Sequence, residues 1–392
     1  MSHDATDTIA AIATPPGRGG IGIVRVSGPQ AATIAQAITG QLPSPRQAVF
    51  SQFKDTQQQL LDEGLVLYFP APHSFTGEDV VELQGHGGPV VLDILLQTIL
   101  AHGVRQARPG EFSERAFLNN KLDLVQAEAI ADLIDSGSAL AARAALRSLQ
   151  GDFSHAVEAL DKAIIALRTY VEAAIDFPDE DVEFLAAPEV HQRIDTIQQQ
   201  FQELENRAQQ GAMLRDGLTL VIAGQPNAGK SSLLNALAGY EAAIVTDIPG
   251  TTRDVLRERI LLDGIPLHII DTAGLRDSGD TIEREGVARA RAEISRANAV
   301  LLIIDATKGW QAEDKAILDA IDSALSVIVV FNKTDLTNGF LPPLLAWERG
   351  SPYPPKTLNL SALTGTGLDT LRQELRTITG VQHSNTDTFS AR

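Results

Sequence analysis

Residues 224–231 read GQPNAGKS, a glycine-rich segment whose spacing can hold a chain of phosphates. In the pattern G-x-x-x-x-G-K-S, backbone N–H groups turn toward phosphate oxygens, the lysine reaches the β- and γ-phosphates, and the serine hydroxyl binds Mg²⁺. An apolar run at 218–223 predicts a strand before the segment, and a helix is expected from about Ser231. The segment predicts a nucleoside-triphosphate site with contacts from Asn227, Ala228, Gly229, Lys230, Ser231 and Ser232.

A second segment, 332–335, reads NKTD and indicates which base the nucleotide carries. The Asp335 carboxylate can accept hydrogen bonds from two adjacent donors of guanine, N1–H and N2–H₂. Adenine has an acceptor at the first position and lacks the second donor, so it would leave the carboxylate unpaired. Residues 361–363, after a strand expected at 357–360, can donate a backbone N–H to guanine O6. The predicted base contacts of this GTP site are Asn332, Lys333, Asp335, Ser361, Ala362 and Leu363.

Two segments between these motifs carry groups suited to Mg²⁺ and the γ-phosphate. Residues 271–274 read DTAG, so Asp271 can hold hydrated Mg²⁺ and the Gly274 N–H can contact the γ-phosphate. Residues 250–254 read GTTRD, and Thr252 can reach the metal. The predicted Mg²⁺ ligands are Ser231 and Thr252, and the further predicted nucleotide contacts are Thr246, Asp247, Ile248, Pro249, Gly250, Thr251, Thr252, Asp271, Thr272, Ala273 and Gly274.

The residue after DTAG bears on how GTP would be hydrolysed. Many small GTPases place a water-orienting glutamine there, whereas this chain has Leu275, which cannot hold water. Glu283, in the segment 280–285, is the candidate for that task. From the residues alone, a solvated surface charge is an equal alternative for Glu283.

These motifs need a scaffold that brings strand ends together. From residue 215 to 380, apolar strands expected at 218–223, 268–270, 299–304, 326–331 and 357–360 alternate with helices. That alternation is typical of a mostly parallel sheet covered on both faces, here an α/β P-loop domain of Ras-like type.

The preceding region, 122–210, is alanine-rich, almost free of glycine, and predicted to be all-α. Apolar residues recur at steps of three and four, which predicts two helices whose stripes form the core of a plain helix bundle. The break at 176–181 suits an antiparallel turn. The stripes are Val157, Leu160, Ile164, Leu167, Val171 and Ile175, then Val190, Ile194, Ile197, Phe201 and Leu204.

Residues 1–120 mix short β-rich runs, at 21–26, 65–69 and 80–83, with glycine and proline turns, which indicates a compact α+β domain. The 392 residues carry a net charge of −18, so a nucleic-acid partner requires a local basic patch or a partner protein. The absence of cysteine excludes thiolate metal sites. No apolar run approaches the roughly 18 residues that cross a bilayer, so we expect a soluble, cytoplasmic protein without membrane contact.

Beyond the nucleotide motifs, the chain resembles the MnmE (TrmE) family of tRNA-uridine-modifying GTPases. The resemblance extends over residues 8 to about 380. It rests on Leu275 and on long matching strings: TPPGRGG at 14–20 with GIVR at 22–25, FTGED at 75–79, QGHGG at 84–88, RPGEFSERAF at 108–117 and NKLDL at 120–124.

The resemblance implies a multidomain protein. Residues 1–120 would be an N-terminal domain that binds folate and dimerises, 121–214 a helical domain, 215–380 the G domain, and 381–392 the polar start of a return to the helical domain. The implied contacts to formyl- or methylene-tetrahydrofolate are Arg25, Glu82 and Lys121. Structural ion pairing is the alternative for all three.

The resemblance also implies a second metal ion and a catalytic residue. Asn227 matches the family's K⁺ ligand, joined by the carbonyls of Thr246 and Ile248 and by Thr251, and Glu283 matches its catalytic glutamate. A monovalent cation beside the phosphates can neutralise developing charge.

The implied activity is a cycle of GTP-driven G-domain dimerisation, hydrolysis and reopening. The cycle is coupled to adding a carboxymethylaminomethyl or aminomethyl group at C5 of the wobble uridine in certain tRNAs. The implied partners are a second copy, tRNA, and MnmG (GidA), a protein that uses FAD and NADH. Family members continue through further helices and finish with Cys-x-Gly-Lys, so in this sequence, ending at Arg392, we expect the helical domain to lack its second half.

Two other classes of function share parts of the nucleotide motif. One is a regulatory GTPase switch in ribosome assembly without modification chemistry, which would carry an RNA-binding module in place of the Arg25, Glu82 and Lys121 set. The other is a membrane iron-transport GTPase, which requires transmembrane helices. Folate binding by the N-terminal region discriminates the first from the modification enzyme.

Overall fold

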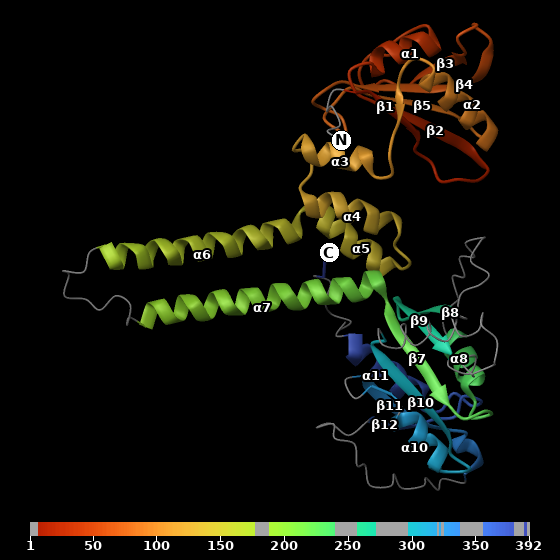
Figure 1. Cartoon of the computed structure of the whole chain (residues 1–392), viewed down its shortest axis with the longest axis vertical. Coiled ribbons are helices and arrows are strands. Elements are labelled where there is room, and N and C mark those ends of the chain that lie inside the picture. Colours follow the sequence, from red (N-terminus) through yellow and green to blue (C-terminus); the bar gives the residue numbers. More distant parts are fainter. Residues whose placement is uncertain are drawn as a thin grey trace. The chain divides into compact units, whose positions relative to one another are not determined.

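The computed structural model describes residues 7–176, 188–239, 257–271, 297–319, 321–322, 325–337, 356–379 and 388–389 (Figure 1). The chain divides into two compact units, Met1–Ile130 and Ala131–Arg392. Within the described residues, none of the helices combines the length and the apolar character needed to cross a membrane.

The first unit is a six-stranded sheet of order β3-β4-β5-β2-β1-β6, with helices on one face. Apolar side chains alternate along the strands, so Val24, Val26, Val81 and Leu83 are buried against the helices. This arrangement confirms the predicted α+β domain. The elements are β1 Ile9–Ile12, β2 Gly19–Ser27, α1 Ala31–Thr39, β3 Val49–Lys54, β4 Leu60–Phe69, β5 Val80–Gly87, α2 Pro89–Leu100, β6 Arg105–Gln106 and α3 Glu111–Leu118, followed by α4 Leu124–Ile134, within which the first unit ends.

The second unit begins with helices, as predicted: α5 Ala139–Gln150, α6 Asp152–Asp176 and α7 Pro188–Asp216. The Ser138 hydroxyl caps α5 by accepting a hydrogen bond from Ala141 N at 3.1 Å. Gly151 ends α5 in the left-handed conformation, with φ of 93°. Helices α6 and α7 run alongside each other (Figure 1).

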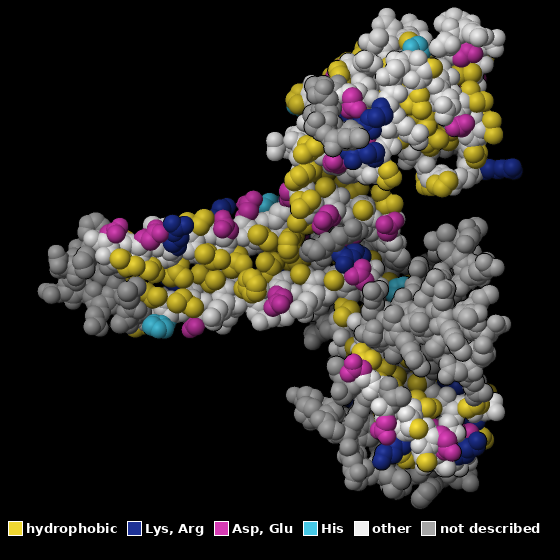
Figure 2. All heavy atoms as spheres, viewed as in Figure 1, with side chains coloured by type: hydrophobic (Ala, Val, Ile, Leu, Met, Phe, Trp, Pro, Cys, Tyr) yellow, Lys and Arg dark blue, Asp and Glu magenta, His cyan; other side chains and the backbone are white. Residues whose placement is uncertain are grey.

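The prediction that both apolar stripes are bundle core is wrong for many of their residues. Leu160 and Val190 are buried, and four others are half-buried. Two helices side by side can bury only the seam between them, so the rest of each stripe stays in solvent. Figure 2 shows hydrophobic side chains along both helices. The exposed stripe residues are Val157, Ile164, Ile175, Ile194 and Phe201.

The remainder of the second unit is the predicted α/β domain, with a sheet of order β12-β11-β10-β7-β9-β8. All neighbouring strands are parallel except β8 and β9. Helices α8 and α11 pack on one face and α10 on the other. The elements are β7 Leu218–Gly224, α8 Lys230–Ala238, β8 Arg257–Leu262, β9 Ile265–Asp271, β10 Ala299–Asp305, α10 Ala312–Asp319, β11 Ser326–Asn332, the 3₁₀ helix η3 Thr334–Leu336, β12 Lys356–Asn359 and α11 Leu368–Thr379.

Strand register places the chemistry-bearing residues at one edge of this sheet. Ile303 in β10 pairs with Gly224 in β7, and Asp305 pairs with Asn332 in β11. Because parallel strands end at the same edge, the loops that follow β7, β10 and β11 meet there. The described end of β9, Asp271, lies at this edge as well, since it pairs with Ile222.

Candidate functional site

The phosphate-binding loop connects β7 to α8 and is shaped by two glycines. Gly224 has φ of 143° and Gly229 φ of 97°, a region that residues with side chains rarely adopt. A Cβ on Gly224 would lie 2.3 Å from the Ile303 carbonyl oxygen, and one on Gly229 would lie 2.2 Å from Asn332 Nδ2. The glycines therefore let neighbouring strand ends approach the loop, besides giving phosphate access to its backbone.

Replacing Gly229 with alanine is expected to weaken GDP binding by about tenfold to a hundredfold, from backbone strain together with the clash. Titration calorimetry with GDP and Mg²⁺ measures this loss. Gly137→Ala is the matched control, because a Cβ there meets nothing within 4 Å and its φ lies outside the left-handed range. Wild-type affinity in Gly229→Ala would contradict the assigned role of this turn.

Lys230, at the first position of α8, is buried, and its ammonium lies inside the turn of the loop. Its Nζ donates to the Gly224 carbonyl at 2.9 Å and to the Gln225 carbonyl at 3.0 Å. Ser231 and Ser232 follow in the first turn of α8 and are exposed. A cation, a helix N-terminus and the exposed hydroxyl that was predicted to bind Mg²⁺ therefore follow one another along a short stretch of backbone.

One buried amide joins the loop to the base-reading segments. Asn332 Nδ2 donates to the Ala228 carbonyl at 3.0 Å, and Asn332 Oδ1 accepts from Lys333 N at 2.8 Å and from Ala362 N at 3.0 Å. Asn332 is only 2% exposed, so these bonds are shielded from water. Three segments far apart in sequence are thus brought together, and the sequence had assigned all three to the same nucleotide.

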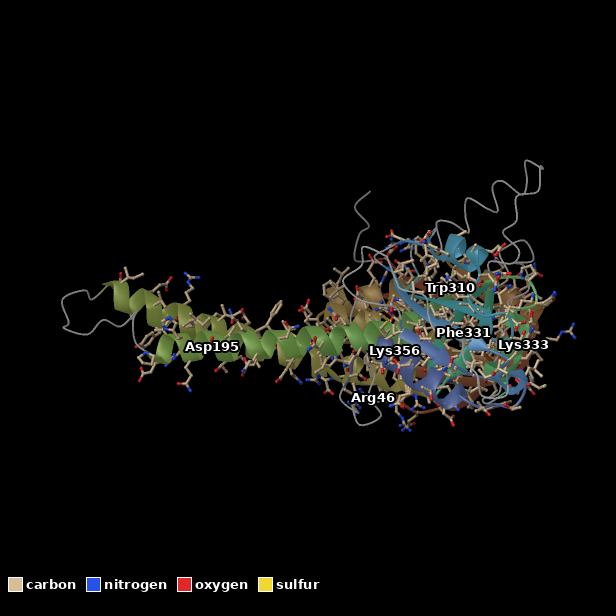
Figure 3. The ribbon with its side chains drawn as sticks, turned by 90° about the horizontal axis from the view of Figure 1, so that it is seen from below. Arg46, Asp195, Trp310, Phe331, Lys333 and Lys356 are labelled. Atoms are coloured by element: carbon tan, nitrogen blue, oxygen red, sulfur yellow. The ribbon has the colours of Figure 1, made fainter. Side chains whose placement is uncertain are left out.

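Lys333 reaches from the end of β11 back to the phosphate loop. Figure 3 shows Phe331 within the sheet and Lys333 beyond it. Lys333 Nζ donates to the Asn227 carbonyl at 2.7 Å and to Asp305 Oδ2 at 2.6 Å. Asp305 was not among the predicted site residues, although an acid directly after a parallel strand at this edge was a usable signal.

Asp335 and the turn at 361–363 are the remaining residues that were predicted to contact the base. Asp335 lies in η3 with an exposed side chain, as a carboxylate that reads a ligand must. Ser361 is buried, and its hydroxyl accepts from Thr364 N at 3.2 Å, while Leu363 is 87% exposed. The Ala362 N–H, one of the predicted donors to guanine O6, donates to Asn332 Oδ1 in this structure.

The groups described here suit metal ions that bind through oxygen. The Ser231 hydroxyl is exposed beside the loop, and Asn227, also exposed, presents an amide oxygen from a backbone with φ of 64°. Among the described residues there is no group of three His, Cys, Asp or Glu side chains that could hold a metal ion.

Several predicted residues lie outside the described part of the chain. For Asp271, the last residue of β9, only the backbone is described. The others are Thr246, Asp247, Ile248, Pro249, Gly250, Thr251, Thr252, Thr272, Ala273, Gly274, Leu275 and Glu283.

A second candidate site lies in the first unit, on the sheet face opposite helices α1 and α2. Arg25 and Glu82 are register partners on β2 and β5, and Arg25 Nη2 lies 2.8 Å from Glu82 Oε1. The guanidinium is also placed over two aromatic rings, 5.4 Å from the centroid of Phe75 and 5.6 Å from that of Phe112. Neither ring was predicted as a site residue, although both lie in the strings that carry the family resemblance.

The structure pairs Arg25 with Glu82, whereas Lys121 is hydrogen-bonded to a backbone carbonyl. Lys121 Nζ donates to the Pro72 carbonyl at 3.0 Å. Glu82 Oε2 also accepts from Gln84 Nε2 at 3.4 Å. The Arg25–Glu82 pair is only partly exposed, with side chains at 27% and 15%, so a ligand that reached it would find both an acceptor and a planar cation.

A partly buried ionic network holds helix α3, which carries Phe112. Arg115 pairs with Asp7, Glu78 and Glu111, and Arg105 pairs with Asp7 and Glu111. The hydrogen bond from Arg105 holds the pKa of Glu111 at about 2, well below its usual value. Because every member of the network is charge-paired, we assign it a structural role.

Two family profiles match the chain: the N-terminus of the GTP-binding protein TrmE over residues 8–121, and the MnmE helical domain over residues 124–392. The tRNA modification GTPase MnmE of Nitrosococcus oceani is 54% identical over 387 residues, which cover 99% of this chain and 83% of the relative. That of Stutzerimonas stutzeri is 56% identical over 392 residues, which cover 99% and 85%. Era from Aquifex aeolicus, a solved structure, is 25% identical with a TM-score of 0.31, over 44% of this chain and 61% of that chain.

The matches cover both units and include the segments that form each candidate site. The first profile ends at residue 121, after the Arg25–Glu82 pair, and the second runs through the phosphate loop and the base-reading strand ends. The chain therefore belongs to the MnmE (TrmE) family of tRNA modification GTPases.

Proposed function

We propose that this tRNA modification GTPase adds a carboxymethylaminomethyl group at C5 of the wobble uridine in certain tRNAs, together with the FAD-dependent protein MnmG. The observation that carries the proposal is the Arg25–Glu82 pair, a built polar site in the same chain as a guanine-nucleotide site. A GTPase that acts only as a switch has no need of the first site. Because tRNA is the substrate, the proposed place of action is the cytoplasm.

In the proposed reaction, GTP binding and hydrolysis at the nucleotide site control the modification of tRNA. Lys230 and the N-terminus of α8 hold the phosphates, Asp335 selects guanine, and Glu283 orients the attacking water. Bound Mg²⁺ and K⁺ would supply positive charge to the phosphate oxygens, with Ser231 and Thr252 holding the first ion, and Asn227, Thr246, Ile248 and Thr251 holding the second. Hydrolysis then resets an association of two G domains.

The folate would occupy the first unit, which we propose to span residues 1–120 and to form the homodimer. Glu82 can accept hydrogen bonds from the donors of a pterin, Arg25 and Lys121 can hold carboxylates, and Phe75 and Phe112 offer apolar ring faces. Bound formyl- or methylene-tetrahydrofolate would supply the one-carbon unit. We propose the helical domain over 121–214 and the G domain over 215–380, with 381–392 returning toward the helical domain.

Potassium is expected to raise the rate of GTP hydrolysis at least about tenfold over sodium at equal ionic strength, because a cation beside Asn227 stabilises charge that develops on the phosphates. Steady-state phosphate release in matched KCl and NaCl buffers measures the ratio. Asn227→Ala should remove most of the difference. Equal rates in both salts for the wild type would remove the potassium role.

Two experiments on the full chain test the proposed function. One measures folate binding, and the other looks for the modified uridine in tRNA. Formyl-tetrahydrofolate should bind the wild type, and Glu82→Gln should lower its affinity about tenfold, because a charged hydrogen-bond acceptor is lost. Glu63→Gln, an exposed acid on β4, is the matched control. With MnmG, tRNA, folate and GTP, mass spectrometry of nucleosides should detect the modified uridine. No folate binding would favour the switch in ribosome assembly.

A further inference from the structure

The end of strand β10 carries an acid, Asp305, that was not among the predicted nucleotide contacts and that pairs with one of them, Lys333. Asp305 is the last residue of β10, and its side chain is 12% exposed. One carboxylate oxygen, Oδ1, accepts from Thr307 N at 3.0 Å and from Thr307 Oγ1 at 2.6 Å. The other, Oδ2, accepts from Lys333 Nζ at 2.6 Å.

The two bonds to Thr307 fix the orientation of the carboxylate. Because Thr307, in the turn after β10, holds Oδ1, the other oxygen, Oδ2, points toward Lys333 at the end of β11. Although burial raises the pKa of Asp305, the hydrogen bonds from Lys333 and Thr307 lower it overall, so the group is charged at neutral pH. A charged acceptor with little freedom of movement is what holds a flexible lysine in one conformation.

Lys333 passes this constraint to the phosphate loop. Its ammonium lies between Asp305 Oδ2 and the carbonyl oxygen of Asn227, at 2.6 and 2.7 Å. Asn227 has φ of 64°, a left-handed conformation that asparagine tolerates better than most residues but that is less favourable than helical or extended backbone. The hydrogen bond from Lys333 to the Asn227 carbonyl helps keep the backbone in that conformation. The backbone conformation in turn sets the direction of the exposed Asn227 side chain.

We infer that Asp305 is a positioning residue for the nucleotide site: it holds Lys333, and Lys333 holds the phosphate loop at Asn227. The base-reading strand and the cation-binding part of the loop are therefore linked through one ion pair. Loss of the ion pair frees Lys333 and releases the Asn227 carbonyl together. The potassium part of this inference rests on the proposed role of Asn227, whereas the nucleotide part does not.

The test uses the full chain with Asp305→Asn, which keeps the shape and an acceptor for Thr307 but removes the charge. GDP affinity by calorimetry is expected to fall about tenfold, the loss typical of one charge-assisted hydrogen bond. The K⁺ concentration for half-maximal GTP hydrolysis is expected to rise about tenfold, as when a residue that orients a metal ligand is lost. Asp369→Asn, on α11 with a side chain 91% exposed, is the matched control.

A double-mutant cycle with Lys333→Met separates positioning from a general effect on folding. If Asp305 acts through Lys333, adding Asp305→Asn to Lys333→Met changes GDP affinity by less than about twofold. If Asp305→Asn does not fold, Lys333→Met alone must show the same rise in the half-activating K⁺ concentration, because it also frees the Asn227 carbonyl.

Two outcomes would overturn the inference. One is a GDP affinity and a K⁺ response in Asp305→Asn that match the wild type. The other is fully additive losses in the double variant, which would make Asp305 a structural residue. A wild type that hydrolyses GTP equally in K⁺ and Na⁺ would refute the proposed potassium site instead, and the GDP affinities would then decide the role of Asp305 alone.

Discussion

Asp335→Asn is expected to shift nucleotide preference from GTP toward xanthosine triphosphate by at least about a hundredfold, because sites built to hydrogen-bond a ligand discriminate strongly against a mismatched one. The carboxylate accepts from both N1–H and N2–H₂ of guanine. An asparagine amide offers one acceptor and one donor, which matches N1–H and the C2 carbonyl of xanthine. The exposed position of Asp335 in η3, beyond the buried Asn332, leaves this edge available to the base.

Competition between the two triphosphates during hydrolysis measures the shift. Asp319→Asn, an exposed acid at the end of α10, makes the same chemical change away from the strand ends and should keep the wild-type preference. Because Asp335 is exposed, its replacement should leave the thermal unfolding temperature nearly unchanged. Undiminished preference for GTP would take Asp335 out of base recognition.

Glu283→Ala is expected to lower kcat about a hundredfold or more, the range for loss of a positioned acid or base, while GDP affinity stays within about twofold. The reason is chemical: Leu275 stands where a glutamine would orient water, and leucine has no polar atom to do so. Single-turnover hydrolysis of GTP separates the chemical step from product release. Glu283 lies outside the described residues, so this prediction rests on its place in the sequence and on the family match.

Glu285→Ala provides the control, since it removes the same charge two positions away. Its kcat should remain near that of the wild type. Equal losses in both variants would indicate a general electrostatic effect of the segment. An unchanged kcat in Glu283→Ala would make this glutamate one more solvated charge in an acidic protein.

Five of the six described strands of the α/β domain were predicted, four of them to within one residue at each end, whereas β8, Arg257–Leu262, was missed. The run expected at 299–304 is β10, Ala299–Asp305, and the run at 326–331 is β11, Ser326–Asn332. Strands buried on both faces are continuously apolar, and their ends are marked by the first polar residue. In both strands that polar residue, Asp305 or Asn332, turned out to lie in the candidate site.

The exposure of the helical stripes was not predictable from their periodicity. A repeat of three and four residues states which side chains share a face, and Val157 and Leu160 do share one. It does not state how many helices cover that face. Within the described residues, α6 and α7 pack against each other. Leu160 is therefore buried, whereas Phe201 is 56% exposed.

The sequence by itself determined the local chemistry of this protein: a loop for phosphates, a carboxylate for guanine, and the order of strands that carries them. These follow from short-range patterns, because backbone conformation and side-chain type act within a few residues. The tertiary structure alone decided which distant groups meet. Asp305, Lys333 and Asn227 form one chain of contacts, and Phe75 and Phe112 flank Arg25, because strand register and packing bring together positions that the sequence keeps far apart.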